Sequence, residues 1–175
     1  MKKKSYRPRS TLLTPQDILR RNAKLKQELV ERVITDRWTN LDQFLQAGEY
    51  AHGAWLDMAD MANVAEHLAR VGIGSGSQAD TILRDAQEAL AYCRQERLAR
   101  GTYALRSDER EIVRERLTLL IELHQLQLRS CTHAEFETAY NAAQRRLEQA
   151  RAGNASPAAI VVLGRIADPT FDGPL

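Results

Sequence analysis

The side chains best suited to acid-base or metal chemistry are four histidines and two cysteines, spread thinly along the chain. They are His52, His67, His124, His133, Cys93 and Cys131. A metal site on one helix needs two such ligands about four residues apart, and a zinc site built from cysteines needs them in closely spaced pairs. No two histidines have that spacing, and no paired C-x-x-C occurs. We therefore predict no catalytic, cofactor-binding or metal-binding residues, and a protein that is not an enzyme.

His124 differs from the other histidines because it lies in an otherwise apolar stretch. Its simplest role is that of a core or interface residue hydrogen-bonded to a neighbour, since one histidine does not make a site. Trp55, Met58 and Met61 recur at helical spacing, which is typical of a helix core and less often of a cofactor pocket. An enzyme with a pocket near Trp55 and His124 is the least favoured of three function classes, for lack of a convergent polar set.

The stretch Gly72-Ile73-Gly74-Ser75-Gly76 is rich enough in glycine to suggest a phosphate-binding loop. Such a loop follows a strand and directs its amides at the phosphate from the start of the next helix. Here a predicted helix precedes the glycines, the G-x-G-x-x-G spacing fails at Ser77, and no lysine follows. The stretch is better interpreted as a linker between two helices, with Gly72 ending the first of them.

Basic residues dominate the start of the chain. Residues 1–26 hold nine lysines and arginines and one acid, a net charge of 9 − 1 = +8, whereas the whole chain carries +2. Such an arm is either a disordered, solvated start or a contact to nucleic-acid phosphates, with Tyr6 available to stack on a base. The nucleic-acid alternative, which would be weak and non-specific, rests on Lys2, Lys3, Lys4, Arg7, Arg9, Arg20, Arg21 and Lys24.

The length of 175 residues, with 43% hydrophobic and 27% charged, is that of one ordinary globular domain. No apolar stretch reaches membrane-spanning length, and no apolar segment of the signal-peptide type follows the basic start. We therefore expect a cytoplasmic protein with no membrane partner. Cys93 and Cys131 are then expected to be buried thiols and not a disulfide bridge.

Helical periodicity runs through most of the chain, and no strand-like alternation is evident. Ser77 with Asp80 and Thr132 with Glu135 have the spacing of capping boxes, and Ser107 is expected to cap the helix that it begins. The helix over 50–71 is expected to be buried on more than one side. The sequence predicts an all-α fold, a single-domain bundle of five to seven helices with a flexible basic N-terminal arm. The expected divisions are a disordered arm over 1–13, the bundle over 14–153, and a partly packed tail over 154–175. The predicted helices cover 15 to 33–36, 39–48, 50–71, 77–100, from 107 through 128, and 133–151.

Two features suggest that the chain associates with itself. Residues 117–128 are apolar nearly all round, which is typical of the central helix of a bundle or of a helix shared between subunits. The tail carries the apolar run Ile160–Leu163, which is expected to pack on its own bundle or on a partner. We expect a homodimer, with self-association through Leu119, Leu123, Leu126, Ile160 and Val162.

Four stretches carry a resemblance. They are SYRPR (5–9), DMADMANVAEHLARVGIG (57–74), DAQEALAYCRQERLARGTY (85–103) and ELHQLQLRSCTHAEFETA (122–139). In order and composition the chain resembles a set of small, uncharacterised helical proteins of proteobacterial genomes, phages and mobile elements. The resemblance implies a bacterial or phage cytoplasmic context and a regulatory or accessory role, and it assigns no site residues. The favoured function is therefore non-enzymatic, a binding or regulatory accessory protein that acts through an unidentified protein partner.

Overall fold

The computed structural model describes residues 15–151, and this part of the chain is all-α. It contains six helices and no strand, so the predicted fold class is confirmed. The helices are α1 Pro15–Asn22, α2 Gln27–Leu45, α3 Ala51–Arg70, α4 Ser77–Arg100, α5 Ser107–Ser130 and α6 His133–Arg151. The predicted arm over 1–13 and the tail over 154–175 lie outside the described residues.

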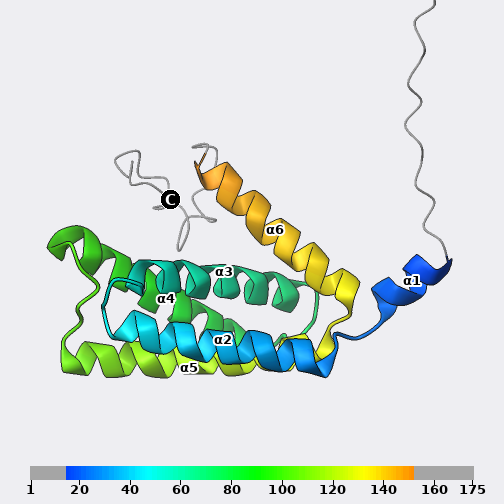
Figure 1. Ribbon diagram of the computed structural model, residues 1–175, viewed down its shortest axis with the longest axis horizontal. Helices are drawn as coiled ribbons and strands as arrows, with labels where there is room; N and C mark the ends of the chain where they lie inside the picture. Colours follow the sequence, from blue (N-terminus) through cyan, green and yellow to red (C-terminus); the bar gives the residue numbers. More distant parts are fainter. Residues whose placement is uncertain (1–14, 152–175) are drawn as a thin grey trace, which may run out of the picture.

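Helices α2 to α5 form an up-and-down bundle in which each helix runs antiparallel to the next (Figure 1). The ring is closed by α5, which lies beside α2, while α6 crosses the outer side of α3 and α1 contacts α6. Short connections between consecutive helices favour this antiparallel arrangement. None of the helices in the described range is long and apolar enough to cross a membrane.

Helix α3 is the central element, because it contacts α2, α4, α5 and α6. Its large side chains Trp55, Met58, Met61 and Leu68 are almost completely buried. Alanines between them, such as Ala62 and Ala65, let the neighbouring helices approach closely. The sequence correctly predicted that this helix is buried on more than one side. Residues 117–128 are not the central helix of the bundle, because α5 keeps an exposed side that includes Leu119 and Leu126. The alternative, a helix shared between subunits, stays a prediction.

The boundaries of the first two helices also differ from the prediction. A single helix from Pro15 into 33–36 was expected, but it is interrupted after Asn22. The intervening backbone pairs with the turn between α5 and α6: the His133 N–H donates to the Ala23 carbonyl at 2.9 Å, and Lys24 forms a bridge with Thr132. These tertiary hydrogen bonds replace those of a continuous helix.

A second helix was expected to start at Thr39, but α2 runs straight through this position. The hydroxyl of Thr39 donates to the Thr35 carbonyl at 3.1 Å. The amide of Asn40 donates to the Asp57 carboxylate on α3 at 2.9 Å. Both side chains are suited to capping a helix, but here they bond along and across the helices instead.

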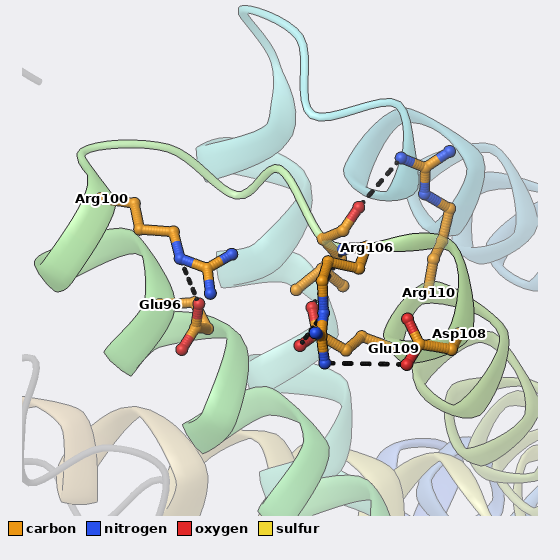
Figure 2. Close-up of polar contacts among 7 residues, drawn as sticks. Glu96, Arg100, Arg106, Asp108, Glu109 and Arg110 are labelled. Atoms are coloured by element: carbon orange, nitrogen blue, oxygen red, sulfur yellow. Dashed lines mark hydrogen bonds and ion pairs between the residues drawn. The ribbon is translucent and has the colours of Figure 1, made fainter.

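Acidic residues control the starts of α5 and α6. The Thr132–Glu135 capping box is confirmed, with the Thr132 N–H donating to the Glu135 carboxylate at 2.7 Å and the Glu135 N–H to the Thr132 hydroxyl at 3.3 Å. The prediction that Ser107 caps α5 was wrong, because Arg106 precedes the first turn and its N–H donates to Glu109 at 2.9 Å. Figure 2 shows Arg106 between the carboxylates of Asp108 and Glu109.

The predicted Ser77–Asp80 capping box does not form either. Gly76 occupies the capping position, with no side-chain cap, and its carbonyl accepts the Asp80 N–H at 3.0 Å. At the other end of the same loop, Gly72 adopts a φ of 91° just after α3, as predicted. Its N–H donates to Ala69 and that of Ile73 to Leu68, which satisfies two carbonyls at the end of α3.

Candidate functional site

The histidines are dispersed over the structure and do not form a site together. The pKa of His52 is lowered by burial and then by the charges of Arg97 and Arg94, and its Nδ1 lies 3.0 Å from the Tyr103 hydroxyl. The pKa of His67 is also lowered, first by burial and then by Arg146. Within residues 15–151, no three histidine, cysteine, aspartate or glutamate side chains gather in a way that could hold a metal ion.

His124 lies in the interior with an exposed fraction of 2%. Burial, followed by the positive charge of Arg37, lowers its pKa to about 4, although Gln127 acts in the opposite direction. Its Nδ1 atom has no hydrogen-bond partner among the described residues. The expectation of a core position is confirmed.

Both cysteines are free and buried, as predicted. Burial raises the pKa of the Cys93 thiol to about 12 and also raises that of Cys131. A thiol reacts as its thiolate, so neither residue is set up as a nucleophile at neutral pH.

Trp55 is part of the core, with an exposed fraction of 1%. Its indole N–H donates to the Leu90 carbonyl at 3.0 Å, which fixes α3 against α4. The Trp55 ring is stacked with the rings of Tyr103 and His52, and its centroid lies 6.3 Å from the centroid of each. A buried indole with a satisfied N–H is a packing element.

A cavity of about 340 Å³ opens between α2 and α3, and it was not predicted from the sequence. Five of its six lining residues are polar or charged, and the set is Val33, Asp36, Arg37, Thr39, Asn40 and Asp57. We call it the α2–α3 cavity. The lining residues of α2 lie on a partly buried side of this helix, and Asp57 joins them only because α3 packs antiparallel to α2. Charged residues on a helix are usually a solvated face, so no local signal could have singled these out.

The basic residues proposed for nucleic-acid contact divide into two groups. Lys2, Lys3, Lys4, Arg7 and Arg9 lie outside the described residues. Arg20, Arg21 and Lys24 are exposed at and just after the end of α1. Arg21 forms an ion pair with Glu137 at 3.7 Å, and the Lys24 ammonium donates to the Ser130 carbonyl. Two of the three described residues therefore already contact α5 or α6.

The residues proposed for self-association are also divided. Leu119 and Leu126 are 40% and 60% exposed, but Leu123 is only 7% exposed and packs inside its own bundle. Ile160 and Val162 lie outside the described residues. Sequence reasoning missed Ile112, which is 52% exposed and lies seven residues before Leu119. Seven residues are about two helical turns, so that spacing was the available signal.

Ile112, Leu119 and Leu126 together form an apolar stripe on the outer side of α5, which we call the α5 ridge. Glu115 and Arg116 lie beside its first half, Glu122 beside its second half and Arg129 beside its end, and Arg116 is already paired with Glu88 of α4. Comparison of the chain with protein-family models, with curated proteins and with solved structures found no match. Function is therefore inferred from the geometry of these surfaces.

Proposed function

We propose that this chain is a non-enzymatic binding protein that acts through protein–protein contacts made by the α5 ridge, with a second copy of the chain as its first partner. The observation that carries the proposal is the ridge itself. Isolated exposed leucines are ordinary on protein surfaces, but three large aliphatic side chains repeated every seven residues line one face of a single helix. The ridge supplies one of the two apolar positions that each heptad of a paired helix uses, so its contact would be narrower than a full coiled-coil seam.

The charges beside the ridge favour an antiparallel pair. In that arrangement Arg129 of one copy approaches the end of the partner's α5 that carries Glu111 and Glu115. In a parallel pair the two arginines would face each other. Antiparallel packing also opposes the two helix dipoles. The ridge covers only one face of one helix, so we expect a reversible dimer and not an obligate one.

Light scattering on the full chain at increasing micromolar concentrations tests this proposal. We expect the average mass to rise from monomer to dimer for the wild type, and to stay at the monomer for a Leu119→Asp, Leu126→Asp double variant. Leu19→Asp is the matched control, because Leu19 on α1 is 73% exposed and lies away from the ridge. A wild type that stays monomeric throughout would remove the proposal. The setting we propose is cytoplasmic, in a bacterium, phage or mobile element.

Nucleic-acid binding through the basic start is a second candidate. The exposure of Arg20, Arg21, Lys24 and Lys26 around the end of α1 supports it, because these side chains extend the charge of the arm onto the surface of the bundle. The contacts of Arg21 with Glu137 and of Lys24 with Ser130 reduce the number of free cations and make this the weaker candidate.

A further inference from the structure

The α2–α3 cavity contains groups of both charge signs. Asp36 lines it, and its carboxylate forms no ion pair or hydrogen bond with the described residues. Asp57 enters from α3, and one of its carboxylate oxygens accepts the Asn40 amide at 2.9 Å, so its other oxygen remains available. Carboxylate oxygens without a hydrogen-bond partner are suitable acceptors for an ammonium group.

Arg37 supplies the opposite charge. Its Nη1 has only a long contact of 3.5 Å with the Asp57 carbonyl. Its Nε atom is buried and has no hydrogen-bond partner among the described residues. A buried donor without a partner is costly, at about 1–3 kcal/mol, so its presence beside the cavity calls for an explanation. Guanidinium groups bind carboxylates through two parallel hydrogen bonds. The Nη2 group of Arg37 forms no hydrogen bond with the described residues, and the contact of Nη1 is long, so the two Nη groups can supply such a pair.

Size and polarity narrow the class of ligand. About 340 Å³ is at the small end of the range for ligand pockets, which begins at roughly 300 Å³. The hydroxyl and amide groups of Thr39 and Asn40 line the wall beside the charged residues. A metal ion is disfavoured by the guanidinium, and a simple anion by the two carboxylates.

We propose that the α2–α3 cavity binds a small zwitterion of the free α-amino acid class. The ligand carboxylate pairs with Arg37, and its ammonium group pairs with Asp36 and the free oxygen of Asp57. This binding function uses α2 and α3, so it is independent of the α5 ridge and of whether the chain dimerises.

The test begins with thermal unfolding of the full chain in the presence of each common α-amino acid, added singly. At least one should raise the melting temperature. Calorimetric titration then compares that amino acid with its decarboxylated amine and with its deaminated acid. We expect the zwitterion to bind at least roughly tenfold more tightly than either half, since each half lacks one charge-assisted contact. The proposal fails if no amino acid stabilises the chain, or if the amine alone binds equally well.

Variants of the cavity provide the second arm. Asp36→Asn, Arg37→Gln and Asp57→Asn should each weaken binding by roughly tenfold. Asp42→Asn is the matched control, because this residue also lies on α2 but its carboxylate pairs with Arg114 of α5 at 3.0 Å. If Arg37→Gln disturbs folding, Asp36→Asn still tests the proposal, because the Asp36 carboxylate forms no ion pair or hydrogen bond with the described residues. Unchanged affinity in Asp36→Asn would overturn the assignment.

Discussion

Gln127 on α5 holds the loop between α3 and α4 in place. Its side-chain amide donates to the Ala65 carbonyl at 2.9 Å and to the Ile73 carbonyl at 3.1 Å. Gly74 packs directly on this side chain, with a φ of 60°. The glycine is required for two reasons, since both the backbone conformation and the space beside Gln127 exclude a Cβ atom.

We expect Gly74→Ala to lower the free energy of unfolding by about 2–4 kcal/mol. A Cβ atom there would lie 2.8 Å from Gln127 Cγ, and alanine is strained at positive φ. Urea unfolding measures the effect. Gly72→Ala is the control for backbone strain alone, because its φ is 91° but nothing lies within 4 Å of its Cβ position. Equal losses in the two variants would show that the contact with Gln127 does not matter.

His124 makes stability depend on pH. Its pKa falls from 6.5 in the unfolded chain to about 4 in the folded chain, because burial disfavours the charged imidazolium. The unfolded state therefore binds a proton more readily as the pH falls below 6.5, and the folded state loses stability from there down to about pH 4.

Replacing His124 by leucine should remove that part of the pH dependence. Between about pH 7.5 and pH 5, the wild type should lose about 2 kcal/mol more of its unfolding free energy than His124→Leu does. Denaturant unfolding of both proteins at the two pH values gives the difference, and other titrating groups cancel in it. Parallel losses in the two proteins would mean that the pKa of His124 is the same in the folded and unfolded chain.

At the scale of elements, Glu66 links three helices. It lies on α3 with an exposed fraction of 23%, and accepts hydrogen bonds from Arg146 on α6 at 3.1 Å and from Gln87 on α4 at 3.4 Å. Arg70, one turn further along α3, also donates to it. The attachment of α6 to the bundle thus combines these polar contacts with the buried faces of Ala139 and Ala143.

We predict that Arg146→Ala loosens α6 selectively. Loss of the ion pair with Glu66 should speed hydrogen exchange of α6 amides by several-fold, corresponding to about 1 kcal/mol, because the pair is partly screened by solvent. Exchange in α2 to α5 should change little. Arg145→Ala is the control, since the Nε of Arg145 donates only to the Asn141 carbonyl on its own helix. Similar exchange in both variants would contradict a role for Glu66.

Helix existence was predictable from the sequence, while several helix boundaries were not. Apolar spacing identified α3 to α6, because a face that must be buried repeats with the helical period. Thr39 and Asn40 look like a helix start, yet Asn40 bonds to Asp57 on another helix, which no local pattern reveals. Ser77 and Asp80 likewise have the spacing of a capping box, but Gly76 takes the capping position.

The candidate sites show the same limit at the scale of the whole molecule. A helix that is apolar nearly all round cannot bury every side, so the exposure of some of its leucines could be predicted. Which ones are exposed depends on how α5 is rotated against the bundle: Leu119 and Leu126 face outward, whereas Leu123 is buried. The α2–α3 cavity could not be predicted, because it joins Arg37 to Asp57 through the packing of two helices. A site that forms only when two helices pack together has no characteristic residue spacing in the sequence.

The basic start provides a prediction about the whole chain. If residues 1–10 contact phosphates, full-length protein should bind a short B-form DNA with a slope of log K against log salt of roughly −4 to −5, from five basic side chains. A variant lacking residues 1–10 should lose this binding and keep its helicity. Fluorescence anisotropy at low and physiological salt measures it, with Arg129→Gln as a control. Absence of binding by the full chain would eliminate the nucleic-acid candidate.

The order in which the helices pack has a consequence for how fast the chain folds. In the ring of α2 to α5, three of the four neighbouring pairs are consecutive in sequence, and only α2 with α5 joins distant segments. Contacts between consecutive helices close short loops, so little chain entropy is lost before they form. The bundle should therefore fold on the microsecond-to-millisecond scale of other helical proteins with low contact order, with closure of the α2–α5 pair as its slowest step.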